Sequence, residues 1–485
     1  MSVVPVPVAW PGQSLLRLRP GVSAVHDGAG RLWLVRGAQR EHVGGTGDNT
    51  LTVLRRLAAA ACTQEQLLAE QDHTEQGTGH MLGGDLLGRL WRGGWLSVTL
   101  EHSARPLLTL ESRGPWPAPQ HLVPTGLGGH EGTPPLRLSR FAVLHRDADR
   151  LIVESPLSPV VVTVCDPMVL PVIFALAAPA GTEPAHAMPD HVSSAVVHTL
   201  AACGLATAAE QDQPRACWEP HDLWFHQRSR QAAGLSRNGT EAGATPPPAV
   251  PPASHPGFGT PRLALARPDL TALQRTEAAF TTVAEARRSQ RQFDDSHPLT
   301  AAEAGEFLYR CARVRWSGQD GGIEVTSRPY PSAGALHELE VYLVAVRVAG
   351  LTDGMYHYRP DSHELESVPA PGQAAARLAQ AAALAIGATA VPQALLVVSA
   401  RFDRVMWKYP GFGYSLVLKD VGALLQTMSL VATAMGLAGC ALGGGDSAVF
   451  ASATGIDPLA EASVGEFVLG SAPGRGEALR KVTAP

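Results

Sequence analysis

The pattern of apolar and polar residues along the first part of the chain predicts short strands and three helices. RLWLV at residues 31–35 is typical of a short strand. Apolar residues then recur at helical spacing in three runs, and a strand pair follows that resembles the wing of a winged helix. The three helical runs and the strand pair occupy residues 51–60, 63–71, 80–96 and 96–111.

The same outline recurs further along the chain. VHDGAGRLWLV from Val25 aligns with LHRDADRLIVE from Leu144, and LLGRLWRGGWLS resembles VVHTLAACGLAT in its pattern. These matches predict that residues 1–115 and 135–207 are two copies of one small winged-helix-like domain. Because short strand–helix patterns also recur by chance, a coincidence is the alternative interpretation.

A change of composition separates these copies from the rest of the chain. WEPHDLWFHQRSR at residues 218–230 is dense in aromatic residues and histidines, and the following NGTEAGATPPPAVPPASHPG cannot bury a core. We therefore expect residues 208–262 to form a linker with a flexible segment. Residues 263–485 are expected to form a further domain with elements in the order α, β, α, β, long α, β.

The long predicted helix of that domain carries no charge from Val421 to Leu442. Polar residues interrupt it, Lys419 and Asp420 precede it, and a glycine cluster follows. A helix buried in the protein or at a subunit interface is therefore favoured over a membrane span. The start MSVVPVPVAW lacks the basic stretch and apolar run of a signal peptide, so a soluble, cytoplasmic protein without a membrane partner is expected.

Composition argues against several classes of function. The net charge of −5 argues against nucleic acid as the main partner, because such a partner requires a basic surface. The six cysteines are scattered without a CxxC pair, which argues against a zinc site or a disulfide scaffold and favours a reducing compartment. No metal site is predicted.

The segment RRSQRQF at residues 287–293 is the first candidate for chemistry. Arg287, Ser289 and Arg291 alternate, so an extended backbone directs all three side chains to one side. Two guanidinium groups and a hydroxyl that converge there suit a phosphate group. For this motif alone, a solvated basic surface is the alternative.

Two further segments suit a flat ligand. SRPYPSAGALHELEVYLV places Pro331, Ser332 and Gly334 directly before a predicted strand, where small residues let backbone amides approach a ligand closely. CALGGGD predicts a tight turn after the long helix. The turn contains Gly443, Gly444 and Gly445. Phosphate-binding and glycine-turn features without GxGxxG or GxxxxGK[ST] point away from a Rossmann or P-loop site.

Five motifs occur in order along the C-terminal part, namely RRSxRxF, RPYPSAGALHELEVYLV, GMYHYRPDSHELE, WKYPGFGY and MGLAGCALGGGD. Together they resemble motifs of the nitroreductase-like flavoenzymes. Within these, the match is to the SagB-type azoline dehydrogenases, the thiazole/oxazole oxidases of ribosomally made peptide natural products (RiPPs). The resemblance covers residues 263–485, and WEPHDLWFHQRSR extends it upstream.

The resemblance implies an α+β fold, an FMN cofactor and a homodimer with the flavin at the subunit interface. It assigns the alternating residues of the 287–291 segment to the FMN phosphate and ribityl chain. It assigns Pro331, Ser332 and Gly334 to the edge of the isoalloxazine ring, and the 443–445 turn to the other side of the flavin.

Lys408 and Tyr409 in WKYPGFGY resemble the catalytic Lys-Tyr pair of these dehydrogenases. Conversion of an azoline to an azole removes a proton from Cα and a hydride from Cβ, so a base is needed opposite the flavin. A lysine whose pKa is lowered by burial can accept the proton, and a neighbouring phenol can share it. The alternative is a strand end whose lysine simply reaches solvent.

Two places depart from the family pattern. The relatives carry an arginine after the aromatic glycine segment and a Gly-His pair inside the long helix, whereas Ser415 and Gly422-Ala423 stand here. These departures concern contacts near that helix rather than FMN binding itself.

The N-terminal copies resemble RiPP recognition elements, which bind a leader peptide as an added strand. A DNA-binding winged helix would show a basic recognition helix. The helix HMLGGDLLGRLWRGGWL carries only Arg89 and Arg92, and HVSSAVVHTLAACGLA carries no lysine or arginine. Binding of a leader peptide or a partner enzyme is therefore favoured over DNA binding.

These features predict an FMN-dependent dehydrogenase that oxidises thiazolines and oxazolines in a precursor peptide, with O2 as the final electron acceptor. A cyclodehydratase that makes the azolines is the expected partner. A generic NAD(P)H-dependent nitro or quinone reductase is one alternative, although it leaves the N-terminal copies and the Lys-Tyr pair unexplained. A non-catalytic scaffold without flavin is the other.

Overall fold

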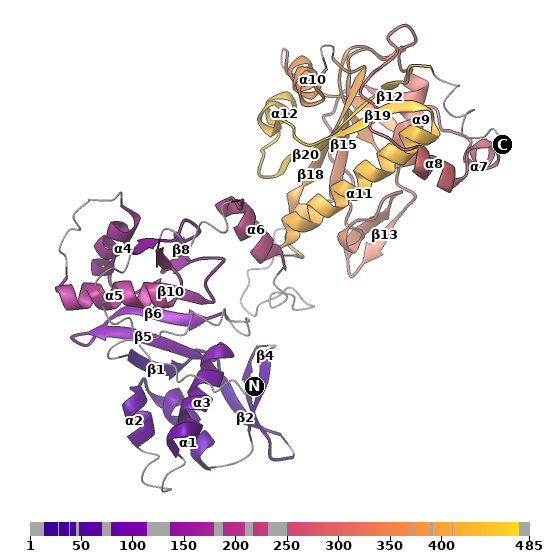
Figure 1. The fold of residues 1–485 in the computed structure, drawn as a ribbon. Coiled ribbons are helices and arrows are strands. Elements are labelled where there is room, and N and C mark those ends of the chain that lie inside the picture. Colours follow the sequence, from indigo (N-terminus) through magenta and orange to yellow (C-terminus); the bar gives the residue numbers. More distant parts are fainter. Residues whose placement is uncertain are drawn as a thin grey trace. The chain divides into compact units, whose positions relative to one another are not determined.

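The protein, seen in a computed structural model, forms two compact units, Met1–Arg228 and Ser229–Pro485 (Figure 1). The first unit contains both predicted winged-helix-like copies, and the second contains the predicted flavin-binding domain. The structure describes residues 14–27, 29–37, 39–44, 48–69, 79–113, 136–178, 188–208, 217–230, 250–370, 373–388, 391–409 and 411–474.

In the first copy, three helices and a hairpin lie where the apolar pattern predicts them. A small sheet of order β2-β3-β4 precedes the helices, and β1 pairs with β5 of the hairpin β5–β6. The elements are β1 (Ser14–Leu18), β2 (Ser23–His26), β3 (Leu32–Arg36), β4 (Gln39–Gly44), α1 (Asp48–Ala59), α2 (Gln64–Ala69), α3 (Gly79–Arg92), β5 (Leu96–His102) and β6 (Arg105–Ser112).

The second copy has strands before and after a helix pair. Its hairpin β8–β9 corresponds to β2–β3 of the first copy, as the alignment of the two sequences predicts. The elements are β7 (Leu136–Leu138), β8 (Val143–Asp147), β9 (Arg150–Glu154), β10 (Val160–Val164), η1 (Pro167–Val169), α4 (Leu170–Ala177), α5 (Asp190–Ala202) and β11 (Ala206–Ala208).

The two copies share one sheet, which the sequence did not predict. Strand β6 of the first copy pairs antiparallel with β10 of the second, with Leu110 opposite Val162, and the sheet order is β1-β5-β6-β10-β9-β8. One apolar core runs from Leu16 to Ala206 across both copies. The wing strand β6 would otherwise expose a free edge, and β10 covers it. The copies are therefore one folded body rather than two separate domains.

The predicted linker 208–262 contributes to both units. Helix α6 (Pro220–Arg230) packs on the second copy, where Trp224 Nε1 donates to the Phe141 carbonyl at 3.1 Å. Residues 250–262 instead belong to the second unit, which therefore begins before the predicted boundary at 263. The part of the predicted flexible segment at 231–249 lies outside the described residues.

The second unit is built on a seven-stranded antiparallel sheet of order β12-β17-β16-β15-β18-β20-β19 (Figure 1). Its strands are β12 (Arg262–Ala264), β15 (Leu339–Ala345), β16 (Gly354–Arg359), β17 (Glu364–Ser367), β18 (Ala394–Arg401), β19 (Leu437–Leu442) and β20 (Glu461–Ser471), and a separate hairpin is formed by β13 (Trp316–Asp320) and β14 (Ile323–Ser327). The helical elements are α7 (Leu270–Thr276), α8 (Phe280–Ala286), α9 (Ala301–Ala312), η4 (Ala333–Ala335), α10 (Ala374–Ala385), η5 (Phe402–Arg404), α11 (Gly413–Ala434) and α12 (Ser447–Thr454).

Helices cover both faces of this sheet. One core contains residues of α9 and α11, and a second core on the other face contains residues of α10 and α12. Every residue of the central strands β15 and β18 is buried, which is why both read as nearly continuous apolar runs. This arrangement of sheet and helices confirms the predicted α+β class.

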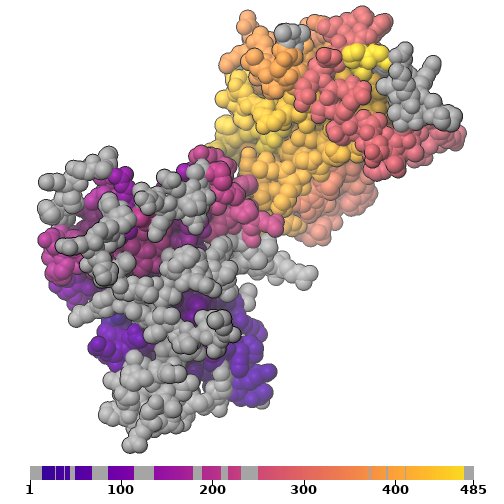
Figure 2. Space-filling model, in the orientation of Figure 1, coloured from indigo at the N-terminus to yellow at the C-terminus, as the bar shows by residue number. Residues whose placement is uncertain are grey.

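Helix α11 confirms a long apolar helix, but it ends at Ala434, and residues 437–442 of the predicted helix form strand β19 instead. By length and composition it is the one described helix that could cross a membrane, but it packs against β19, β20 and α9. Only 33% of its most apolar window is buried within the unit. Its outer face carries Tyr414 and Leu418, which are 41% and 40% exposed, and orange residues of this region reach the surface in Figure 2.

Candidate functional site

The arginine segment leaves helix α8 and runs along the open edge of the sheet. Arg287 follows α8 in extended backbone, with φ −59° and ψ 122°. The N–H of Gln290 donates to the carbonyl of Gly439 in edge strand β19 at 3.0 Å. Arg287 is half-buried, and Ser289 and Arg291 are exposed. The predicted phosphate residues thus lie beside β19.

The charges of this segment have no protein counterpart in the described parts of the chain. Neither Arg287 nor Arg291 makes a side-chain hydrogen bond or ion pair with a described residue. Like charges this close in sequence repel each other, and an anion between them relieves the repulsion. A phosphate fits this arrangement, since arginine binds it through paired N–H groups.

The glycine turn follows β19 directly, so it begins at the same edge of the sheet. A Cβ atom at Gly445 would overlap the Glu466 carboxylate, so any other residue there requires the Glu466 side chain to move. A Cβ atom at Gly443 or Gly444 would meet no described atom within 4 Å. Gly443 and Gly444 therefore present bare backbone to open space, as close contact with a flat ligand requires.

The turn at residues 332–334 brings predicted residues from two distant segments together. Gly334 has a left-handed backbone with φ +61°, and a Cβ atom there would lie 2.9 Å from Tyr409 Oη and 3.0 Å from Lys408 Nζ. Both the backbone and the available space therefore favour glycine. The phenol and the ammonium group converge over one backbone position of the turn that Ser332 begins.

Lys408 and Tyr409 are held by a compact turn after β18 and η5. The N–H groups of both residues lie 3.2 Å from the Val405 carbonyl, and the Tyr409 ring packs against Phe412 with centroids 5.5 Å apart. Both side chains are half-buried. No carboxylate of the described residues lies within ion-pair distance of Lys408 Nζ.

Two buried carboxyl groups support this turn, and the sequence analysis missed both. Ser332 Oγ donates to Glu338 Oε2 at 3.0 Å, and the Ala333 N–H donates to Asp420 Oδ2 at 2.9 Å. Burial and the nearby Asp420 raise the pKa of Glu338 to about 7, and burial raises the pKa of Asp420. The available signal was the motif ELE, which places Glu338 and Glu340 at the start of an otherwise apolar strand.

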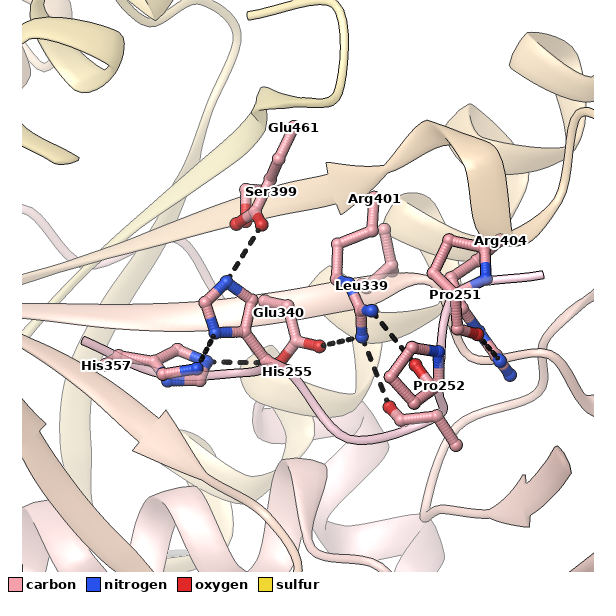
Figure 3. Close-up of polar contacts among 12 residues, drawn as sticks. Pro251, Pro252, His255, Leu339, Glu340, His357, Ser399, Arg401, Arg404 and Glu461 are labelled. Carbon is pink, nitrogen blue, oxygen red and sulfur yellow. Dashed lines mark hydrogen bonds and ion pairs between the residues drawn. The ribbon is translucent and has the colours of Figure 1, made fainter. Parts of the chain in front are cut away.

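A second buried polar cluster lies on the central strands (Figure 3). Glu340 lies 3.2 Å from His357 Nε2 and 3.4 Å from Arg401 Nη1, and Glu461 lies 3.2 Å from His255 Nε2. Burial acts to raise the pKa of Glu340, but His357 and the nearby arginines outweigh it and lower the pKa to about 2. The described residues contain no group of side chains that could hold a metal ion.

The two departures from the family pattern lie on α11. Ser415 is buried, and its Oγ donates to the Phe412 carbonyl at 2.8 Å, so it closes the start of the helix. Gly422 is exposed and Ala423 is half-buried. Neither position supplies the arginine or the histidine that the family resemblance implies there.

Two family models match the chain. The nitroreductase family matches residues 284–471, and the family described as cyanobactin oxidase ThcOx matches residues 136–233. The latter match covers the second N-terminal copy together with α6.

Three named proteins are similar in sequence. MJ1384 of Methanocaldococcus jannaschii, named as a nitroreductase, is 31% identical over 157 residues, which are 32% of this chain and 74% of MJ1384. The microcin B17-processing protein McbC of Escherichia coli is 32% identical over 126 residues, 23% of this chain and 42% of McbC. The trifolitoxin-processing protein TfxB of Rhizobium leguminosarum bv. trifolii is 26% identical over 142 residues, 29% of this chain and 38% of TfxB. The chain thus spans less than half the length of the two processing proteins that it matches.

The solved structures that are similar to this chain include a peptide-processing complex and a nitroreductase. A chain of the E. coli microcin synthetase McbBCD complex, with truncated pro-MccB17 bound, has 23% identity and a TM-score of 0.34 over 45% of this chain and 77% of that chain. A nitroreductase in complex with FMN from Exiguobacterium sibiricum has 15% identity and a TM-score of 0.29 over 41% and 91%. The family match and the similarity to MJ1384 across most of its length show that this chain belongs to the nitroreductase family of flavin-binding oxidoreductases.

Proposed function

We propose that the chain is an FMN-dependent dehydrogenase that oxidises thiazoline and oxazoline rings of a ribosomally made peptide to thiazoles and oxazoles. The observation that carries this proposal is the convergence of Lys408 Nζ and Tyr409 Oη over Gly334. The names of the relatives support a peptide substrate, because two of them process the peptides microcin B17 and trifolitoxin. The match of residues 136–233 to a cyanobactin oxidase family points to the same kind of chemistry.

The described residues fit an FMN molecule in three respects. Arg287 and Arg291 have no side-chain partner among the described residues and would hold the phosphate, together with Ser289. The bare backbone at Gly443 and Gly444 and the turn at 331–334 would contact the ring system. FMN bound there would supply the two-electron acceptor for the oxidation, with O2 as its final oxidant.

The chain's own residues would manage the proton. Lys408 in its neutral form removes the Cα proton of the azoline ring, and Tyr409 Oη, which converges on the same position, shares that proton by hydrogen bonding. Gly334, in the turn that Ser332 begins, leaves the space that both groups occupy. The azoline loses one proton to the base and one hydrogen with its electron pair to the acceptor, so the ring becomes aromatic.

The proposal includes a homodimer with the flavin sites at the subunit interface. The arginine segment lies beside edge strand β19, whereas Gly334 lies with Lys408 and Tyr409 near the Asp420 side of α11. The apolar helix α11 leaves Tyr414 and Leu418 on an open face that a second copy could cover. Two copies would then bring both groups of residues to one flavin.

A precursor peptide, held through its leader by the first unit, and a cyclodehydratase that makes the azolines are the proposed partners. The free edge of β4 in the sheet β2-β3-β4 offers a place for an added leader strand. We place the reaction in the cytoplasm, which suits six free cysteines of which two are exposed.

The test is the double substitution of Lys408 and Tyr409 by alanine. The wild-type protein should remove two hydrogens per azoline ring of a heterocyclised peptide, as mass spectrometry detects. The double variant should lose this activity while the purified protein keeps its yellow flavin. Full activity of the variant would refute the mechanism. Rapid NADPH oxidation with nitroaromatic compounds, without an effect on azoline peptides, would favour a generic reductase, and a colourless protein would favour a scaffold.

A further inference from the structure

A short segment upstream of the sheet is held against the second unit by hydrogen bonds, and we name residues Pro251–His255 the strap. Arg404 Nη1 donates to the Pro251 carbonyl at 2.6 Å, and Arg401 Nη2 donates to the Pro252 carbonyl at 2.9 Å. Figure 3 shows both arginines directed at the two prolines. Pro251 is half-buried and Pro252 is exposed, and because proline has no N–H group, each offers only its carbonyl to the arginines.

Arg404 makes the wider set of contacts. It is fully buried, and besides Pro251 it donates through Nε and Nη2 to the Leu336 carbonyl at 3.2 and 2.7 Å and through Nη2 to the Glu324 carbonyl at 2.9 Å. Three separate segments are thereby joined by one guanidinium group. No carboxylate among the described residues forms an ion pair with it, so backbone carbonyls alone satisfy the charge.

These contacts connect the two halves of the proposed catalytic group. Leu336 follows Gly334 by two residues, and Arg404 precedes Lys408 by four. The Arg404 carbonyl also accepts from Trp407 Nε1 at 3.1 Å, which ties the intervening turn back onto Arg404. The guanidinium group therefore links the turn that carries Gly334 to the turn that carries Lys408 and Tyr409.

From this geometry we infer that Arg404, with the strap seated on it, is a positioning residue that holds Lys408 and Tyr409 over Gly334. The inference rests on the proposed function. Lysine cannot replace Arg404 in this role. The guanidinium group of Arg404 donates to carbonyls that lie in different directions, and the single ammonium group of a lysine cannot reach all of them. Because reacting groups must be placed to within about 1 Å, a looser link would cost about 10²-fold in the chemical step.

Arg401 provides a matched control. It lies three residues before Arg404, and it holds the next two carbonyls of the strap, those of Pro252 and Ala253. It makes no described contact with Leu336, and its acidic partner is Glu340. Replacement of either arginine by lysine loosens the strap, but only Arg404→Lys releases the Leu336 carbonyl.

The experiment compares Arg401→Lys and Arg404→Lys in the full-length protein on an azoline peptide. Arg404→Lys should lower kcat about tenfold to a hundredfold, with KM and flavin content within about twofold. Arg401→Lys should keep kcat within about threefold of the wild-type value. This difference in kcat should remain even if both variants have melting temperatures that are lower than that of the wild type by a similar amount. Equal losses of kcat in the two variants would overturn the inference and leave a purely structural role.

A second measurement depends neither on enzyme activity nor on bound flavin. It can therefore test the role of Arg404 even if the proposed function is wrong. The acylation rate of Lys408, followed by peptide mass spectrometry, should change in Arg404→Lys and stay near the wild-type rate in Arg401→Lys. A wild-type protein that does not oxidise azolines would refute the proposed function, while the labelling rates would still decide the role of Arg404. Identical labelling in all three proteins would refute that role.

Discussion

The two units differ in how many ionisable side chains they bury. In the described part of the first unit, Glu154 is the only Asp, Glu, Lys, Arg or His that is buried. The second unit buries many such groups in and beside its sheet. They are Arg328, Glu338, Glu340, His357, Arg359, His363, Glu366, Arg401, Arg404, Asp420, Glu461 and Glu466, together with His255 and His337. Because burial of charge is costly, its concentration in one unit marks where the molecule needs polar groups at fixed positions.

Substitution of Glu340 by glutamine tests this contrast with the largest expected effect. Glu340 and its partner His357 are almost fully buried and Arg401 is 8% exposed, so the change leaves buried polar partners without their carboxylate. We expect a loss of about 3–5 kcal/mol in the free energy of unfolding, measured by denaturant titration.

Glu154→Gln is the matched change in the first unit. Glu154 also pairs with arginine and histidine. Its partner Arg113 is 15% exposed, but Arg228 and His145 are 51% and 38% exposed, so water can replace part of the lost contacts. A smaller loss of about 1.5–3 kcal/mol is expected. Equal losses for the two variants would remove the distinction between the units.

The arginine segment 287–291 differs from the buried charges of the second unit, because its arginines lie at the surface of that unit. Replacement of Arg287 and Arg291 by alanine should weaken FMN binding about tenfold to a hundredfold for each lost charge-assisted contact. Unfolding of the flavin-free protein should change little, because neither side chain has a partner among the described residues.

Arg288→Ala provides the control for that measurement. Arg288 lies between the alternating positions and is exposed, so FMN affinity, measured by fluorescence titration, should stay within about twofold of the wild type. An equal loss of affinity for Arg288→Ala would indicate a diffuse basic surface instead of a phosphate site.

The pH dependence of stability offers the most specific test. Glu338 has a pKa of about 7 in the folded protein, raised from an ordinary value near 4.5 by burial and by Asp420. Its contribution is therefore fully present below about pH 4.5 and is lost as the pH rises through about 7. The wild type should lose on the order of 3 kcal/mol relative to Glu338→Gln across that range. Parallel stability curves for the two proteins would show that Glu338 does not hold a proton there.

Much of the second unit could be predicted from the sequence because its motifs and apolar runs are local. The long helix, the central strands and the small residues around Gly334 each carry a signal within a few positions. That Lys408 and Tyr409 converge on Gly334 agrees with the motif order, although neither spacing nor periodicity would place them together.

The remaining features depend on contacts between distant positions. Arg404 binds a carbonyl 153 residues away, and backbone carbonyls leave no trace in the pattern of side chains. The strap lies in a proline-rich stretch whose composition alone suggests a linker. The Glu338–Asp420 pair was missed because a single acidic residue in a strand or a helix usually faces solvent.

The sheet that joins the two N-terminal copies limits how the chain can be divided. A cut between residues 113 and 136 would follow the apparent repeat, but it would separate β6 from β10 and leave two long, unprotected strand edges. Such edges recruit other strands, so the halves would be prone to self-association. A truncated or chimeric protein that keeps this fold must therefore carry both copies together.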